Sequence, residues 1–205
     1  MIPLSNAHTH TTYCHGAASP EELVRAAIDQ NMTALGFSSH AFTPFDDSYC
    51  MSQQDTVAYI AEIGALKKKY EGRIEILLGV EQDLYSEVYP PAFDYRIGSV
   101  HYIHQDGEYL PVDESPERFV RDVREHFGGD YYFCCRKYYE QVAALEAAVH
   151  PDFFAHLDLV TKFNKGNRFF DEEDKRYQMP ALEALLYLLA AKKPFELNVG
   201  VIYRG

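Results

Sequence analysis

The sequence has 205 residues, of which 47% are hydrophobic, with a formal net charge of −12 and a pI near 5.1. This length and apolar content suffice for one α/β domain with a core, and no shift in composition divides the chain, so a single domain over residues 1–205 is predicted. The acidic surface field repels polyanions, which argues against nucleic acid as a partner. No window approaches the roughly 18 consecutive apolar residues of a membrane span, and the start lacks a basic leader. We therefore expect no membrane association and a cytoplasmic location.

Short apolar runs alternate with helical patterns along the chain, which is typical of a parallel sheet flanked by helices. Six strands are expected, at residues 2–7, 34–38, 74–80, 95–100, 153–157 and 194–199. Helices are expected at residues 20–31, 53–70, 116–127, 130–149 and 180–191. Ser19 before Pro20 marks the start of the first helix, and Gly72 follows the end of the second. The predicted fold class is therefore α/β.

Ionisable side chains occur at or near the C-terminal ends of the first five strands, the edge at which βα barrels carry their active sites. The period of an extended chain directs His8 and His10 to the same face. Alone, such a pair is more often an incidental strand end, and a lone Glu after a strand is more often solvated. Seven such residues at successive strand ends instead favour a shared metal site, made of His8, His10, His15, His40, Glu81, His101 and His156. Three further histidines lack this placement and are expected to be ordinary surface residues: His104, His126 and His150.

The mixture of ligand types in this set indicates its chemistry. Glu81 follows a strongly apolar run, where burial of a carboxylate costs several kcal/mol unless a cation or a donor compensates it. Histidine and carboxylate ligands together suit zinc, manganese or iron. Two or three such ions close together bind the oxygens of a phosphate ester and lower the pKa of a bridging water. The sequence thus predicts a metal-dependent phosphoester hydrolase with two to three divalent ions (Zn, Mn or Fe) and no covalent intermediate.

Five segments also resemble a known family when taken in order. They are Asn-Ala-His-Thr-His-Thr-Thr-Tyr-Cys-His-Gly from residue 6, Gly-Phe-Ser-Ser-His ending at residue 40, Leu-Leu-Gly-Val-Glu ending at residue 81, Ile-Gly-Ser-Val-His-Tyr ending at residue 102, and Ala-His-Leu-Asp-Leu-Val from residue 155. Together they resemble the polymerase and histidinol phosphatase (PHP) superfamily, and most of all its histidinol-phosphate phosphatase branch. The resemblance covers residues 6 to about 200.

The resemblance implies a distorted seven-stranded (β/α) barrel of the TIM-like PHP type. It implies hydrolysis of L-histidinol phosphate to L-histidinol and phosphate, in histidine biosynthesis, at a trinuclear metal centre. Residue by residue, the first ion would be held by His8, His10 and Glu81, the second by Glu81, His101 and His156, and the third by His15 and His40. Glu81, His101 and His156 would carry catalysis.

The sequence also departs from the family pattern. Family members carry a further strand that ends in an Asp-x-His motif, and residues up to 205 contain no such motif. We therefore expect a barrel without its last strand–helix unit and a third ion with few ligands. One alternative is a catalytically inactive metal-binding scaffold, and another is a homo-oligomer in which a partner copy covers the open seam.

Charged side chains after the fifth and sixth strands are the candidates for substrate binding. Lys162, Arg168 and Arg204 are cations that would neutralise a phosphoryl group, with solvated surface charge as the alternative. Asp158 and Glu196 would bind the amino group of histidinol or orient metal ligands. A phosphodiesterase or exonuclease of the same superfamily is an alternative activity, against which the acidic surface argues.

Overall fold

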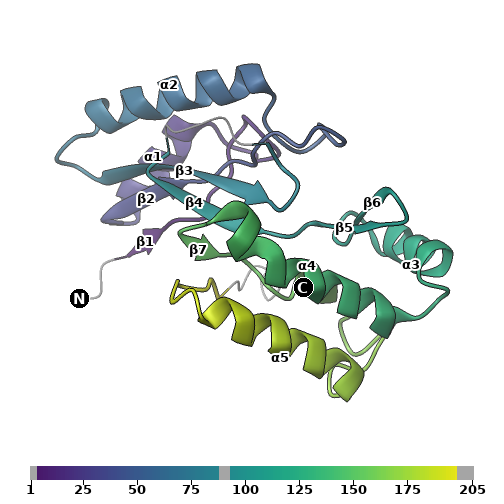
Figure 1. The fold of residues 1–205 in the computed structure, drawn as a ribbon. Helices are drawn as coiled ribbons and strands as arrows, with labels where there is room; N and C mark the ends of the chain where they lie inside the picture. Colours follow the sequence, from purple (N-terminus) through teal and green to yellow (C-terminus); the bar gives the residue numbers. More distant parts are fainter. Residues whose placement is uncertain (1–3, 88–92, 198–205) are drawn as a thin grey trace. The chain divides into compact units, whose positions relative to one another are not determined.

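The computed structural model describes residues 4–87 and 93–197. The chain divides into two compact units, unit 1 with residues 1–97 and unit 2 with residues 98–205 (Figure 1). A single domain over residues 1–205 stays a prediction. Within the described residues, no helix is long and apolar enough to cross a lipid bilayer.

The sheet of unit 1 contains the parallel strands β1 (Ser5–Asn6), β2 (Ala34–Phe37) and β3 (Glu75–Asp83) in that order, with β4 (Tyr95–Ser99) next to β3. Leu35 of β2 is paired with Asn6 on one side and with Ile76 on the other, so β2 is the middle strand. β2 confirms the strand predicted at residues 34–38. β1 is shorter than the strand predicted at 2–7, whose first two residues lie outside the described part.

β3 extends further than its apolar run predicts. Glu81, Gln82 and Asp83 continue the strand instead of following it, so the prediction that the strand ends at Val80 is wrong. All three polar residues are buried, with exposed fractions of 1%, 8% and 1%. The strand continues because the chain beyond β2 still pairs with it. The Ala41 N–H donates to the Glu81 carbonyl at 2.8 Å, and the backbones of His40 and Glu81 form an isolated parallel β-bridge. Backbone pairing thus carries polar side chains into the interior.

Two helices of unit 1 begin with capping boxes. In α1 (Pro20–Asp29) Ser19 caps the first turn together with Glu22, and in α2 (Gln53–Lys69) Ser52 does so with Asp55. Both confirm predicted helices, although α1 ends two residues before the predicted end. α2 lies over the sheet of unit 1 (Figure 1) and buries Tyr59, Ile63 and Leu66. These side chains belong to one apolar core with Phe37, Ile76 and Val80 of the strands.

The strands of unit 2 are short. β4 (Tyr95–Ser99) begins in unit 1 and ends in unit 2, where the Ala155 N–H donates to the Gly98 carbonyl at 3.0 Å. β7 (Phe153–Phe154) has only two residues, so the prediction that a strand over 153–157 carries His156 is wrong. His156 lies two residues beyond β7. The sixth predicted strand is present as one parallel bridge between Phe154 and Phe195, and its last two residues lie outside the described part.

A β-hairpin in unit 2 was not predicted. β5 (Tyr102–Gln105) and β6 (Glu108–Pro111) pair in antiparallel register. Asp106 and Gly107 join them with φ angles of 53° and 83°, the left-handed pair that a two-residue hairpin turn requires. The Asp-Gly dipeptide is the signal that predicts such a turn.

Three α-helices lie in the described part of unit 2. α3 (Pro116–His126) and α4 (Tyr131–Val149) confirm two predicted helices. α5 (Lys175–Leu189) begins five residues before the predicted start at Pro180, because Asp174 caps it and the proline lies inside the helix. α4 and α5 run side by side (Figure 1), and the hydroxyls of Tyr139 and Tyr177 lie 2.8 Å apart between them.

Candidate metal centre

The loop after β1 brings three histidines to one end of the unit 1 sheet. The Ser38 N–H donates to the Thr9 carbonyl at 2.8 Å, and the Thr9 N–H donates to Ser38 Oγ at 3.0 Å. Thr9 stands between His8 and His10, so these two bonds fix the backbone of both histidines against the end of β2. The His8 N–H also donates to Asn6 Oδ1 at 2.9 Å.

Glu81 is the centre of the unit 1 cluster. Its Oε2 atom lies 3.1 Å from His8 Nε2, 3.3 Å from His10 Nε2 and 3.2 Å from His40 Nδ1. The side chain of Glu81 is fully buried. Burial of a carboxylate is costly unless positive charge or donors surround it, and three imidazoles supply that surrounding here. Three of the predicted histidine ligands therefore contact one oxygen atom of a fourth predicted ligand, Glu81.

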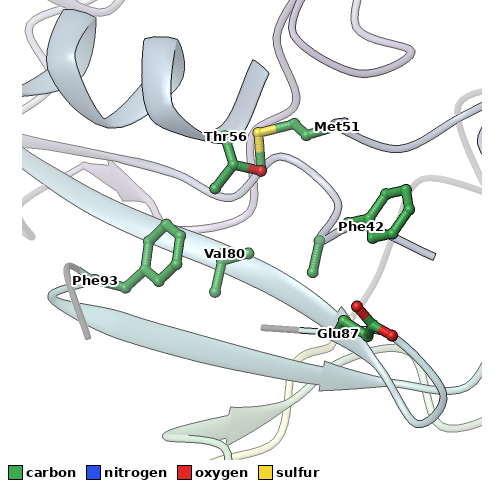
Figure 2. A pocket seen from close by; sticks show the side chains of 7 residues that line it. Phe42, Met51, Thr56, Val80, Glu87 and Phe93 are labelled. Atoms are coloured by element: carbon green, nitrogen blue, oxygen red, sulfur yellow. The ribbon is translucent and has the colours of Figure 1, made fainter. Parts of the chain in front are cut away.

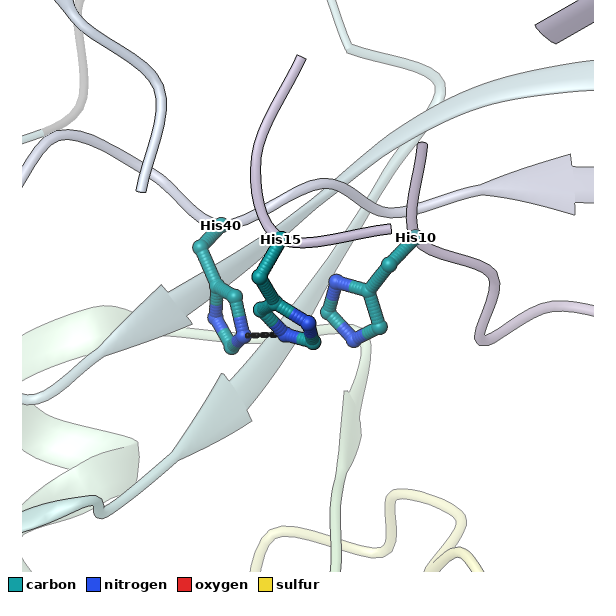
Figure 3. Close-up of side chains that lie close together, drawn as sticks. All are labelled: His10, His15 and His40. Atoms are coloured by element: carbon teal, nitrogen blue, oxygen red, sulfur yellow. Dashed lines mark hydrogen bonds between the residues drawn. The ribbon is translucent and has the colours of Figure 1, made fainter. Parts of the chain in front are cut away.

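His15 joins this cluster from the exposed side. Its Nε2 atom lies 3.0 Å from His40 Nε2, and the rings of His10, His15 and His40 lie side by side (Figure 3). One ligand atom from each of these three residues lies within 4.8 Å of the other two. The rings of His10 and His40 are stacked, with centroids 4.4 Å apart. The five predicted ligands of unit 1 are thus linked by contacts into one cluster.

The spacing of the donor atoms fits a divalent ion. Ligand atoms about 2.05 Å from a tetrahedral ion lie about 3.3 Å from one another. The pairs around Glu81 and the His15–His40 pair are separated by 3.0 to 3.3 Å. Two facing imidazole nitrogens can share only one proton, whereas a cation accepts the lone pairs of both. The residues of unit 1 therefore fit divalent metal binding.

Cys14 contacts the cluster and is absent from the predicted site residues. Its Sγ lies 3.5 Å from His10 Nδ1. Burial raises the pKa of the Cys14 thiol, but hydrogen bonds with His10 and Ser39 outweigh this effect and lower the pKa to about 7. Burial lowers the pKa of His10, but hydrogen bonds with Cys14 and Glu81 outweigh it and raise that pKa above its usual value. The only sequence signal for Cys14 is its position between two predicted ligands.

The two predicted ligands of unit 2 are neighbours. The ring centroids of His101 and His156 lie 5.1 Å apart in an edge-to-face arrangement. His101 is buried two residues beyond the end of β4, and its Nδ1 lies 3.4 Å from Ser99 Oγ. The His156 N–H donates to Glu196 Oε2 at 3.3 Å. Glu196 therefore holds the backbone that carries His156.

The predicted substrate-binding residues of unit 2 have different surroundings. Lys162 Nζ donates to the carbonyl of Asp113 at 2.8 Å and to its carboxylate at 3.0 Å. The Arg168 guanidinium lies over the Phe169 ring and lines a shallow groove that includes Arg121 and Arg124 of α3. Asp158 precedes the short 3₁₀ turn Leu159–Thr161. Arg204 lies outside the described residues.

A small cavity in unit 1 has a different character from the histidine cluster. It is lined mainly by apolar side chains, among them Phe42, Met51 and Phe93, with Glu87 at its edge (Figure 2). Val80 also lines it. Because side chains alternate along a strand, Val80 points away from the face that carries Glu81. The cavity is therefore part of the apolar packing and adds no group to the metal centre.

Parallel strands that end in a cluster of histidines around a buried glutamate define a protein with a metal centre on an α/β fold. Residues 6–198 match the PHP domain family, and the chain belongs to that family. It is 33% identical to a protein named probable histidinol-phosphatase from Deinococcus radiodurans. The match extends over 174 residues and covers 80% of this chain and 64% of that protein. It is 30% identical to the histidinol-phosphatase of Bacillus subtilis. This match extends over 185 residues and covers 78% of this chain and 68% of that protein. The chain thus spans about two thirds of the length of these relatives.

Solved structures confirm the fold class. A crystal structure of a protein named as a histidinol phosphatase (HisK) from Listeria monocytogenes has a TM-score of 0.81 at 21% identity, over 96% of this chain and 83% of that one. A histidinol phosphate phosphatase from Lactococcus lactis, in complex with zinc, L-histidinol and phosphate, has a TM-score of 0.65 at 20% identity, over 95% of this chain and 72% of that one. The predicted α/β fold and the predicted family are both confirmed.

Proposed function

We propose that the protein is a metal-dependent phosphomonoesterase that hydrolyses L-histidinol phosphate to L-histidinol and phosphate. The observation that carries this proposal is the meeting of His8, His10 and His40 at one buried oxygen of Glu81, in a chain of the PHP family. Support for the substrate comes from the two relatives named as histidinol-phosphatases and from the zinc, histidinol and phosphate bound by the Lactococcus protein.

The proposed ligand assignment follows the family resemblance. His8, His10 and Glu81 bind the first ion, Glu81 binds the second together with His101 and His156, and His15 and His40 bind the third. Bound divalent ions lower the pKa of a coordinated water and offset the charge of the phosphate. Zinc, manganese and iron all suit such ligands, and two to three ions are proposed. Glu81 has the central role because its carboxylate is the only anion among the five clustered ligands of unit 1.

Charged side chains of unit 2 are proposed to hold the substrate. Lys162, Arg168 and Arg204 neutralise the phosphate, and Asp158 and Glu196 receive the amino group of histidinol. Lys162 exchanges its contact with Asp113 for the substrate phosphate when it takes this role. Glu196 already accepts a hydrogen bond from the His156 backbone, so it also orients that ligand.

Phosphate release from L-histidinol phosphate tests the proposed activity. Purified protein supplemented with Mn²⁺ or Zn²⁺ should release phosphate, and a chelator should abolish the release until metal is restored. No release with any of zinc, manganese or iron would refute the assigned substrate. Bound metal without turnover on any phosphoester would favour the metal-binding scaffold instead. Faster cleavage of bis(p-nitrophenyl) phosphate or single-stranded DNA would favour a phosphodiesterase, an activity that the net charge of −12 disfavours.

The proposal has consequences for the setting in which the protein acts. A histidinol-phosphatase would act in histidine biosynthesis, and a cytoplasmic location is proposed with it. The partner would be a small phosphorylated metabolite, without nucleic acid or membrane. A homo-oligomer stays a prediction, and light scattering of the purified protein would test it.

A further inference from the structure

Tyr95 lies across the unit 1 sheet at a place where two strands have no side chains. A Cβ atom added at Gly79 would lie 2.2 Å from Tyr95 Cζ, and one added at Gly36 would lie 2.4 Å from the Tyr95 hydroxyl oxygen. Both distances are below any real Cβ contact, so the ring occupies the space that a larger residue would fill. The glycines of β2 and β3 thus form a slot for one aromatic ring.

The hydroxyl of Tyr95 reaches the backbone where β1 leaves the sheet. The oxygen lies 2.6 Å from the Ala7 carbonyl and 2.9 Å from the Phe37 carbonyl. Burial raises the pKa of Tyr95 well above its usual value, so the hydroxyl keeps its proton and acts as a donor. Regular pairing of β1 with β2 ends at Asn6, so the Ala7 carbonyl has left the regular strand pairing.

The Ala7 carbonyl belongs to the same peptide group as the His8 N–H. The hydroxyl of Tyr95 has one proton, which the shorter of its two contacts directs to the oxygen of this peptide group, and the nitrogen donates to Asn6 Oδ1 at 2.9 Å. Both polar atoms of this peptide are therefore held, and on the other side of His8 the Thr9 N–H donates to Ser38 Oγ at 3.0 Å, so the two peptide planes that flank His8 together fix the direction of its Cα–Cβ bond. The His8 imidazole, so directed, lies 3.1 Å from Glu81. A rotated peptide would turn this ring away from the carboxylate.

We propose that Tyr95 is a positioning residue of the metal centre: its hydroxyl fixes the Ala7–His8 peptide and thereby aims His8 at the ion shared with Glu81. This inference rests on the proposed metal site, and it adds a residue that carries no ligand atom. The glycine slot keeps the ring in place, and the hydroxyl provides the directed contact.

The variant Tyr95→Phe tests the proposal because it keeps the ring in the slot and removes only the hydroxyl. Tyr70→Phe is the matched control in the same unit, since its hydroxyl donates to Glu21 at 2.9 Å, between the two helices. Titration with Co²⁺, followed by calorimetry and by the visible absorption of the bound ion, should give a dissociation constant about 10-fold weaker for Tyr95→Phe than for wild type. Tyr70→Phe should bind Co²⁺ as wild type does. Both variants should lose similar, small amounts of thermal stability.

Several outcomes would overturn this role. Wild-type Co²⁺ affinity and an unchanged absorption spectrum in Tyr95→Phe would refute it, as would an equal loss of affinity in Tyr70→Phe. Gly79→Ala provides a second test, because the added methyl must displace the Tyr95 ring and should weaken Co²⁺ binding as well. A wild-type protein that binds Co²⁺ but releases no phosphate from histidinol phosphate would refute the proposed function and leave this test intact. A wild-type protein that binds no ion would overturn both.

Discussion

Replacement of Glu81 by glutamine is the perturbation with the clearest expected effect. The substitution keeps the shape of the side chain and removes the anion at which His8, His10 and His40 meet. Without a metal ion the three imidazoles provide hydrogen-bond donors to the buried oxygen of Glu81, and the amide oxygen of glutamine can accept from them as well, whereas a neutral amide is a much weaker ligand for a cation than a carboxylate. The metal-free protein should therefore change little in stability, whereas its response to metal should largely disappear.

The magnitude follows from binding linkage. Loss of a residue that only orients a ligand weakens metal binding about 10- to 100-fold, so loss of a direct anionic ligand should weaken it at least about 100-fold. At an ion concentration 100 times the wild-type dissociation constant, the wild type gains about 2.7 kcal/mol of stability and the variant about 0.4 kcal/mol. For a chain of this length the difference of about 2.3 kcal/mol corresponds to about 5 to 9 °C in Tm.

Thermal unfolding with and without Zn²⁺ measures this difference. Glu75→Gln is the control, because Glu75 lies at the exposed start of the same strand and contacts none of the clustered histidines. The control should show the full metal-dependent shift of Tm. If Glu81→Gln showed the same shift as wild type, Glu81 would not be a ligand and the reasoning about its burial would be refuted.

Two further predictions concern stability away from the metal centre. Hydrogen bonds from Lys69 and Arg25 lower the pKa of Glu21 from its usual value of 4.5 to about 2, so its stabilising effect is present above pH 4.5 and is lost as the pH falls to about 2. In thermal scans Glu21→Gln should be less stable than wild type at pH 7 and equal to it near pH 2, and an equal deficit at both values would contradict this. Leu188 is fully buried, so Leu188→Ala should lose about 2 to 5 kcal/mol in urea unfolding, whereas Leu186→Ala, at a side chain that is 58% exposed, should change by no more than about 0.5 kcal/mol. Equal losses would show that α5 packs by another face.

The sequence predicts which side chains gather in unit 1 better than it predicts the strands that carry them. His8, His10, His15, His40 and Glu81 were predicted from their places near strand ends, and they meet in unit 1. Their types and positions single them out because few structural roles place five such groups near successive strand ends, and their role as metal ligands stays a proposal. His101 and His156 are neighbours in unit 2, as expected of two ligands of one ion. Their role as metal ligands stays a proposal.

The predicted strand ends are wrong where the hydropathy of the side chains and the pairing of the backbone disagree. Val80 is the last apolar residue of its run, yet β3 continues to Asp83 because the backbone beyond β2 still offers partners and the histidines surround Glu81. Hydropathy describes single residues and cannot represent compensation by distant side chains. At Phe154 the opposite occurs: the apolar run continues, but the strand stops.

Tyr95 shows what a pattern of residue types leaves out. In the sequence it is the first residue of a strand, and nothing near it indicates a role at residue 7 or 8. Its proposed role depends on Gly36 and Gly79 in other strands and on the Ala7 carbonyl, which lies beyond the last regular pair of β1 and β2. The hairpin at Asp106 and Gly107, by contrast, has a local signal that a search for two-residue turns predicts.

A crystal structure of the protein loaded with Zn²⁺, with anomalous scattering measured at the zinc edge, tests the central claim most directly. The account predicts an anomalous peak about 2.0 to 2.2 Å from Glu81 Oε2 and from the ring nitrogens of His8 and His10. Zinc that binds only elsewhere, or an empty cluster at a zinc concentration that supports activity, would contradict it.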